Sequence, residues 1–329
     1  MILVTGGGGF IGSHLLNILL EQGQTVRVME KPGANIEHLP KEQIDVVFAD
    51  LRDEAAIKKA TKQCKQVYHL AADPNLWRKN PAEFDAINHI GTANVIKHSL
   101  DNGAERVLHC STESILTSES FHGGAVEDLI LKEKDMLGPY CLSKFKAEQV
   151  AFEYAKKSNA VIVASPTLPV GPGDRLLTPP TRMNVAFCQG KLPAILDCKI
   201  NLIDVRDVAD GMIAAMSSGK PGIRYLLGNE NMLLSDWLRL LGGFCGQTVP
   251  RYKVPYTLAM TAAWFSEHWA SYISGTMPMA TLTGVRLTQR SMHFDPAKSL
   301  STLGIRPRPV RDSAREAVNW YHENGWLKK

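Results

Sequence analysis

Tyr140 and Lys144 are two residues of this 329-residue chain whose types and spacing could do chemistry. Residues four apart lie on one face of a helix, so the phenol and the ammonium are expected to point into the same space. A free phenol has a pKa near ~10, and lowering it by ~3 units takes about 4 kcal/mol, which neighbouring positive charges can supply. The pair therefore predicts a phenol that exchanges a proton near neutral pH. A helix surface pair without chemistry is the alternative.

Three hydroxyl side chains that follow a predicted strand, 106–110, are candidates for the same site. A hydroxyl at the carboxyl end of a strand can hydrogen-bond a substrate oxygen and orient it toward the phenol. Capping of the loop is the alternative role for each of them. The three candidates are Ser111, Thr112 and Ser114.

A glycine-rich segment, residues 5–12, stands between a predicted strand and a predicted helix. Gly6 permits a tight turn, Gly9 lets the backbone approach a pyrophosphate, and Gly12 allows close packing of helix and strand. The following helix would direct free N–H groups and its positive dipole end at the phosphates. The segment predicts a dinucleotide site rather than a turn without ligand, and an oxidised nicotinamide would add a second cation beside the phenol. Its expected cofactor-binding residues are Gly6, Gly9, Phe10, Ile11 and Gly12.

The end of the second predicted strand carries side chains that could discriminate between nicotinamide cofactors. A carboxylate about 20 residues after the glycine loop accepts the ribose hydroxyls of NAD and repels a 2′-phosphate. Glu30 has this place, whereas the adjacent Lys31 would favour the phosphate of NADP if it turned inward. We expect NAD, with NADP not excluded. Ordinary charge at a strand end is the alternative for both residues.

The ends of the third and fourth predicted strands complete the expected cofactor site, because ligands bind at the carboxyl ends of parallel strands. Asp50 and Leu51 are expected to face the adenine ring. Small residues after the fourth strand would let the backbone pass beneath the cofactor. These are Leu70, Ala71 and Ala72.

Short apolar runs alternate with longer amphipathic ones through the first half of the chain. The predicted strands are 1–5, 25–29, 45–49, 66–70, 106–110 and 160–165, and the helices between them are 10–22, 53–62, 81–102 and 139–157. Later helices are predicted at 182–189, 207–217, 235–244, 256–274 and 310–324, and later strands at 200–205 and 224–227. This order predicts an α/β fold, a Rossmann-type doubly wound parallel sheet with a smaller C-terminal substrate lobe. We place the dinucleotide-binding domain at 1–165 and the substrate lobe mainly at 166–329, with 200–218 returning to the Rossmann domain.

Composition narrows the classes of protein. Hydrophobic residues make up 44% and charged residues 21%, which is ordinary globular usage. A net charge of +4 without a long basic run argues against a nucleic-acid partner. The six cysteines and ten histidines lack the spacing of a metal site or a disulfide framework, so we expect no metal. With the fold starting at residue 1, we expect a cytoplasmic protein.

The most apolar late stretch, 255–273, is interrupted by Glu267 and His268. A membrane span needs ~20 largely uncharged residues, so we expect no integral membrane span here. The stretch indicates a packed, aromatic-rich helix, and a face that rests on a membrane surface stays open.

The glycine loop, the Tyr140–Lys144 pair and the hydroxyl loop together resemble the extended short-chain dehydrogenase/reductase family, over nearly the whole chain. The Asn-x-x-Gly-Thr run at 88–92 and the segment 203–209 are similar to further motifs of that family. The resemblance implies a homodimer formed through helices 81–102 and 139–157. It also implies the roles of four residues: Thr112 as the catalytic hydroxyl, Tyr140 as acid/base, Lys144 as its partner on the nicotinamide ribose, and Pro166 beside the nicotinamide.

Within the family, segments 69–77, 143–148, 224–228 and 304–309 resemble the dihydroflavonol reductase branch and the hopanoid-associated sugar epimerases. Two positions depart from these patterns. Ser114-Ile115-Leu116-Thr117 replaces the Val-Tyr-Gly of epimerases, and Glu30 stands where reductases usually carry a basic residue. The second departure puts the branch's preference for NADP in doubt.

The sequence indicates less specifically which residues line the substrate-binding site. Apolar residues suited to a hydrophobic ketone or alcohol, with interdomain core as the alternative, are Leu76, Trp77, Leu176, Leu177, Met183 and Phe187. Cations that could hold the diphosphate of a nucleotide-sugar, with a solvated surface as the alternative, are Arg175, Arg182 and Arg286.

Three functions follow from these patterns. The first is an NAD(P)-dependent oxidoreductase that transfers hydride between nicotinamide and a carbonyl or secondary alcohol of a small-molecule substrate. The second is a nucleotide-sugar 4-epimerase or dehydratase with transient hydride transfer to bound NAD. The third is a cofactor-binding protein without chemistry, against which the intact set of Thr112, Tyr140 and Lys144 argues.

Overall fold

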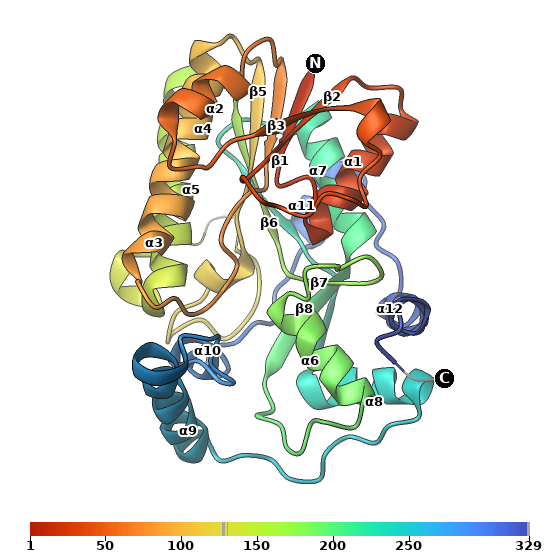
Figure 1. The fold of residues 1–329 in the computed structure, drawn as a ribbon. Helices are drawn as coiled ribbons and strands as arrows, with labels where there is room; N and C mark the ends of the chain where they lie inside the picture. The colour runs from red at the N-terminus through yellow and green to blue at the C-terminus, as the bar shows by residue number, and fades with distance from the viewer. Residues whose placement is uncertain (127–128, 130, 328–329) are drawn as a thin grey trace.

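A seven-stranded parallel sheet forms the centre of the computed structural model, which describes residues 1–126, 129 and 131–327 (Figure 1). Its strand order is β3-β2-β1-β4-β5-β6-β9, so the chain runs outward from β1 in both directions. The strands are β1 (Ile2–Thr5), β2 (Val26–Glu30), β3 (Ile44–Phe48), β4 (Gln66–His69), β5 (Arg106–Cys110), β6 (Val161–Pro166) and β9 (Arg224–Leu227). The predicted α/β, doubly wound parallel sheet is confirmed.

Helices cover both faces of this sheet. One face carries α1 (Phe10–Glu21), α7 (Val205–Ser218) and α11 (Ala297–Leu303), and the other carries α2 (Glu54–Ala60), α4 (Gly91–Asp101) and α5 (Gly138–Ser158). The pleat of β1 sends Val4 to the first face and Leu3 to the second, and both side chains are fully buried. The carboxyl ends of the strands therefore stand between two packed layers.

The predicted helix 81–102 is one helical run with a change of pitch. It comprises α3 (Ala82–Phe84), a π-helical turn η2 (Asp85–Ile90) and α4. The π turn adds a residue to the helical cycle and is frequently found at functional sites. Here it carries Asn88, whose side chain is buried.

The second half of the chain forms a second, smaller sheet and also contributes elements to the large sheet and its helical layer. A three-stranded sheet of β7 (Leu168–Val170), β8 (Lys199–Asp204) and β10 (Glu230–Leu233) packs with α6 (Pro179–Cys188), α8 (Leu234–Cys245) and α12 (Val310–Glu323). Segment 200–218 is divided, because β8 pairs in this small sheet while α7 packs on the large one. β9 also joins the large sheet. The proposed boundary near residue 165 stays a prediction, and residues 328–329 of the proposed lobe lie outside the described residues.

The predicted helix 256–274 is α9 (Tyr256–Trp269) followed by a π turn, η5 (Ala270–Ser274). Its buried residues are small, namely Ala259, Ala263 and Ala270, whereas Trp264 and Phe265 are exposed. The predicted aromatic-rich helix packs through these alanines, whereas its large side chains are exposed and not packed as expected. Among the described residues, no helix is both long and apolar enough to cross a membrane. The remaining short elements are η1 (Lys41–Gln43), η3 (Glu113–Ile115), η4 (Glu133–Asp135) and α10 (Leu282–Leu287).

Candidate active site

The glycine loop follows β1 and leaves no room for side chains at two positions. Gly6 has φ +72°, and a Cβ there would lie 2.9 Å from the backbone nitrogen of Ala71. A Cβ on Gly12 would lie 2.1 Å from the carbonyl oxygen of Gly6. Gly9 is the N-cap of α1 and provides no side-chain cap, and Phe10 is the first residue of that helix. The loop therefore brings bare backbone and a helix N-terminus together, as an anionic pyrophosphate requires.

Glu30 ends β2 and lies against this loop. Its Oε1 accepts the backbone N–H of Gly8 at 2.6 Å. Burial raises the pKa of the carboxyl, and the Gly8 hydrogen bond and the charge of Lys31 oppose that rise. The Lys31 side chain is exposed, so at this strand end the acidic group is the one beside the glycine loop.

The residues after β3 and β4 lie at the same edge of the sheet. Arg52 holds both carboxylate oxygens of Asp50 and lowers the pKa of that carboxyl to about 2. Leu51 is buried, and a Cβ added to Gly91 would lie 2.7 Å from its Cβ, so this glycine lets α4 approach.

The backbone after β4 is held by β1. The N–H of Leu70 donates to the Thr5 carbonyl at 3.2 Å, and the N–H of Ala71 donates to Thr5 Oγ1 at 3.1 Å. Leu70, Ala71 and Ala72 are half-buried. They follow β4, and the direction of the strand order reverses between β1 and β4, which is the ligand-binding point of such sheets.

Tyr140 lies in the first turn of α5 and is nearly buried. Its ring meets Phe84 edge to face with centroids 6.1 Å apart, and the Thr112 side chain lies beside its hydroxyl. Burial raises the pKa of the phenol, and Thr112 partly opposes this. Of the three hydroxyl candidates, Thr112 is the one that acts on the phenol, and its Oγ1 lies 3.2 Å from Ser114 Oγ.

Glu113 is an acidic neighbour of the Tyr140 phenol, and its sequence pattern alone did not predict it as a site residue. Thr112 Oγ1 donates to its Oε2 at 3.3 Å, so phenol, hydroxyl and carboxyl form a chain. Burial raises the pKa of this carboxyl to about 7. Its adjacency to Thr112 was the available signal, but burial is a three-dimensional property that this adjacency does not reveal.

Lys144 lies one turn beyond Tyr140 but reaches toward β5. Its Nζ donates to the Cys110 carbonyl at 2.8 Å, and burial lowers the pKa of the ammonium. The ammonium thus binds the end of β5, and its lowering of the phenol's pKa stays a prediction. The four-residue spacing predicts that Tyr140 and Lys144 lie on one face of α5, but it does not predict the direction of the long, flexible Lys144 side chain.

Asn88 joins the loop after β4 to α5. Its Oδ1 accepts the N–H of Asp73 at 2.8 Å, and its Nδ2 donates to Ser143 Oγ at 3.1 Å. Ser143 Oγ in turn donates to the carbonyl of Tyr140 at 2.8 Å. This network fixes the turn of α5 that carries the phenol.

The apolar residues proposed for the substrate wall are divided between several places. Leu76 belongs to the cluster around Tyr140, whereas Phe187 is buried in the core of the smaller sheet. Phe187 is therefore lobe core and not a wall. Pro166 ends β6 and is buried beside the strand that carries Leu227.

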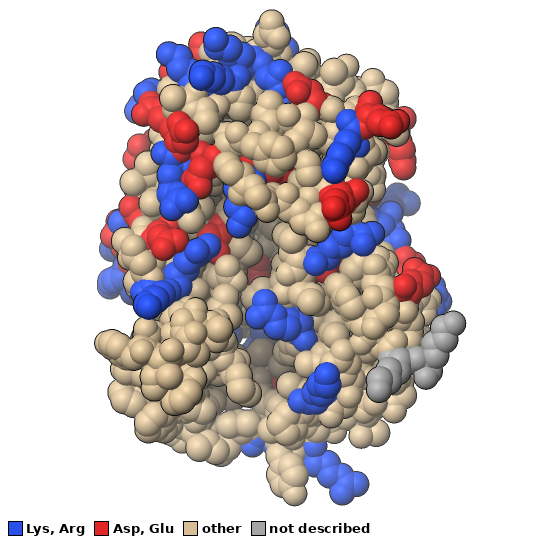
Figure 2. Space-filling model, in the orientation of Figure 1, with Lys and Arg blue, Asp and Glu red and all other residues tan. Residues whose placement is uncertain are grey.

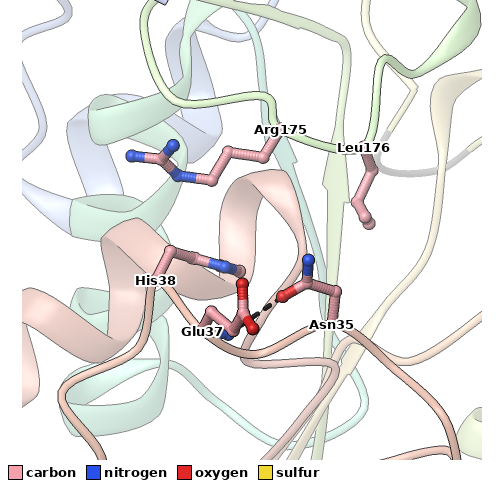
Figure 3. Close-up of a pocket in the computed structure, with 5 residues that line it drawn as sticks. All are labelled: Asn35, Glu37, His38, Arg175 and Leu176. Atoms are coloured by element: carbon pink, nitrogen blue, oxygen red, sulfur yellow. Dashed lines mark hydrogen bonds between the residues drawn. The ribbon is translucent and has the colours of Figure 1, made fainter.

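A cavity of about 210 Å³ lies between the loop after β2 and the loop after β7, and Figure 3 shows the residues that line it. His38 adjoins the glycine loop, since its Nε2 lies 3.2 Å from the Gly8 carbonyl oxygen. Across the cavity, the charge of Arg175 lowers the pKa of His38 together with burial, which is the larger cause. Leu176 lines this cavity rather than the surroundings of Tyr140. The lining residues are Asn35, Glu37, His38, Arg175 and Leu176.

Comparison with known proteins agrees with this arrangement. Residues 2–228 match the model of the NAD dependent epimerase/dehydratase family, and the chain belongs to that family. It is 32% identical over 329 residues to a "Putative dihydroflavonol 4-reductase" of Synechocystis sp., covering 99% of this chain and 95% of the relative. It is 25% identical over 326 residues to "Sterol demethylase protein B" of Methylococcus capsulatus, covering 99% of both chains.

Solved structures agree in fold. The crystal structure of gox2253 has a TM-score of 0.86 and 31% identity, covering 100% of this chain and 99% of that one. MoeE5 in complex with UDP-glucuronic acid and NAD has a TM-score of 0.75 at 21% identity, covering 98% of this chain and 99% of that one. The predicted extended short-chain family and its NAD-dependent oxidoreductase chemistry are confirmed at the level of the family.

Proposed function

We propose that the protein is a reductase or dehydrogenase that interconverts a ketone and a secondary alcohol with NAD(H). The observation that carries the proposal is the position of the Tyr140 phenol beside the Thr112 side chain, near strand ends that also carry the glycine loop. Bound NADH supplies a hydride in one direction, and NAD takes one up in the other. Gly6, Gly9 and Gly12 form the backbone cradle for its pyrophosphate, and Pro166 lies beside its nicotinamide.

The side chains act on the substrate oxygen. Tyr140 donates its hydroxyl proton to the carbonyl oxygen as the carbonyl becomes an alcohol, and recovers a proton in the reverse reaction. Thr112 hydrogen-bonds the same oxygen and orients it. Lys144 holds the nicotinamide ribose, and its ammonium favours the phenolate once its positive charge lies near the phenol.

Apolar packing around the phenol favours the reductase over the nucleotide-sugar enzyme. Phe84, Leu76 and Ile115 belong to the cluster that holds Tyr140. A hydrophobic carbonyl compound fits these surroundings better than a charged diphosphate does. Substrate identity is tested by a panel of ketones with NADH, in which falling absorbance of reduced nicotinamide supports the proposal.

A nucleotide-sugar 4-epimerase or dehydratase is the second candidate, and Glu113 favours it. Elimination of water needs an acid or base besides the phenol, and a carboxyl with a pKa of about 7 beside Thr112 can serve as one. Turnover of a nucleotide-sugar without net change of the cofactor would establish this function and exclude the reductase.

We infer a preference for NAD over NADP from the place of Glu30, whose carboxylate would accept ribose hydroxyls and repel a 2′-phosphate. Cofactor titrations of wild type and Glu30→Ala test it. Wild type is expected to bind NAD more tightly, and the variant is expected to lose most of that discrimination. Equal affinity of wild type for both cofactors would refute the assignment. We further propose a cytoplasmic homodimer, formed through the helical run α3–α4 and α5.

A further inference from the structure

The helix α9, the turn η5 and the loop after them present an unusual surface. Most exposed large hydrophobic side chains of the described residues lie between residues 252 and 279. Phe265 is 62% and Tyr272 84% exposed. We call this surface the α9 face and define it by Trp264, Phe265, Trp269, Tyr272, Ile273 and Met279.

The α9 face is almost without charge. From residue 254 to residue 285, Glu267 is the only Asp, Glu, Lys or Arg in the sequence. Its Oε1 accepts the N–H of Leu282 at 2.7 Å, so the carboxylate caps α10. Figure 2 shows the corresponding lower left of the molecule as a continuous area without charged side chains.

Cations flank this uncharged segment in the sequence. Arg251 and Lys253 precede it and Arg286 follows it, all three are exposed, and Lys253 pairs with Asp197 at 2.7 Å. Arg286 lies close enough to Glu267 to lower the pKa of that carboxyl, while burial raises it. Apolar aromatic side chains flanked by cations are complementary to an anionic lipid surface, where Trp and Tyr occupy the headgroup level.

A second copy of the chain fits the α9 face less well. A twofold contact sets the same patch against itself, so the flanking cations would meet like charges. Small alanines hold α9 to the body while the large side chains are exposed, and a deformable lipid headgroup layer can enclose such side chains.

We propose that the α9 face rests on the surface of an anionic lipid bilayer, with its aromatic side chains at the headgroup level. The adjacent helix α10 lies between this face and the candidate active site. A Cβ added to Gly284 would lie 3.4 Å from Leu76, and one added to Gly138, two residues before Tyr140, would lie 2.2 Å from Thr283. Together with the proposed function, on which this step rests, the lipid contact indicates a carbonyl compound dissolved in the lipid as the substrate class.

Sedimentation with vesicles tests the proposal without any assay of activity. The full chain is mixed with vesicles of phosphatidylcholine alone or with one quarter phosphatidylglycerol. Wild type is expected to bind the anionic vesicles, and Phe265→Ser/Trp269→Ser to bind at least tenfold more weakly. Phe48→Ser changes an exposed phenylalanine on β3 and is expected to bind as wild type does. Arg251→Gln/Arg286→Gln is expected to lose about fivefold per cation on anionic vesicles only, and Arg311→Gln to lose nothing.

Three results would overturn the proposal. The first is wild type that stays unbound with both vesicles, and the second is a double variant that binds as tightly as wild type. The third is a dimeric wild type together with a monomeric Phe265→Ser/Trp269→Ser variant, which would show that the α9 face is a contact between two copies of the chain. Tyr272→Ser, at the most exposed aromatic position of the face, repeats the test if the double variant does not fold. Absence of ketone reduction, by contrast, would refute only the proposed function and the substrate class.

Discussion

The hydroxyl of Tyr140 is the group on which the chemistry depends at the scale of single residues. We expect Tyr140→Phe to reduce turnover by ~10²-fold or more, because the phenol is the group that exchanges the proton with the substrate oxygen in the proposed reaction. Cofactor affinity should stay close to that of wild type, since the cradle lies at the end of β1. Steady-state kinetics and a cofactor titration measure the two effects.

Tyr154→Phe is the matched control, because it removes a phenol hydroxyl from the same helix, fourteen residues farther along and partly exposed. It should leave turnover unchanged. Wild-type turnover by Tyr140→Phe on the true substrate would show that another group is the acid/base.

Glu113 makes the stability of the fold depend on pH. Burial raises the pKa of its carboxyl to about 7 in the folded chain, whereas an unfolded chain titrates near ~4.3. Between these values the folded state binds the proton more tightly, so the free energy of unfolding falls as the pH rises and levels off above about 7. Glu113→Gln removes this loss, and we expect the variant to gain about 1–3 kcal/mol relative to wild type between pH 4 and pH 8.

Denaturant unfolding at a series of pH values measures this difference. Glu119→Gln is the control, since it makes the same substitution in a side chain that is 94% exposed. A constant difference for Glu113→Gln would mean that folding leaves the pKa of this carboxyl unchanged.

The glycine loop and α1 form one element in which neighbouring glycines do different work. A Cβ on Gly9 would lie 3.2 Å from the Gly6 carbonyl, a contact that a small shift relieves, whereas one on Gly12 would lie 2.1 Å from it. We expect Gly9→Val to lose cofactor binding with a modest change in Tm, because its side chain takes the place of the pyrophosphate. Gly12→Ala should lower the free energy of unfolding by about 1–3 kcal/mol or more.

Gly243→Ala supplies the control, because a Cβ there meets nothing within 4 Å and lies in the helix α8. It should leave cofactor binding unchanged and stabilise the fold slightly. Calorimetric titration and thermal unfolding separate the effects, and tight NAD binding by Gly9→Val would contradict the cradle.

Elements with many apolar residues could be predicted from the sequence, and short ones could not. The run 224–227 predicted β9 with its observed bounds, because buried parallel strands are continuous apolar runs. β7 has three residues including Pro169, and β10 carries exposed polar side chains, so neither has a pattern of its own. Both strands form because each pairs with β8 in the small sheet.

The same distinction holds for the residues of the candidate site: local features could be predicted from the sequence, and long-range contacts could not. The glycine loop and the Tyr140–Lys144 spacing are local, so the sequence could predict them. The bond of Lys144 to Cys110, the burial of Glu113 and the core position of Phe187 depend on segments far apart in the chain. The outward direction of Trp264 and Phe265 is likewise set by which alanines pack, and not by hydrophobicity.

At the scale of the whole molecule, the proposed dimer and the proposed lipid surface use different faces. The helices α4 and α5 pack side by side on one face of the large sheet, and η2 beside them leaves Ile90 48% exposed (Figure 1). An exposed isoleucine at the centre of a helical face suits the apolar core of an interface. In Figure 1, α9 lies below these helices with α10 beside it, so the proposed dimer and the proposed lipid contact use different elements.

We expect wild type to sediment as a dimer and Ile90→Asp to weaken that dimer at least ~30-fold, because a charge in an apolar interface core is desolvated without a partner. Ile223→Asp is the matched control, since Ile223 is 43% exposed in the turn before β9 and outside the two helices. The control, and Phe265→Ser/Trp269→Ser as well, should remain dimeric in sedimentation equilibrium. A monomeric wild type, or an Ile90→Asp variant as dimeric as the control, would remove the helical face from the assembly.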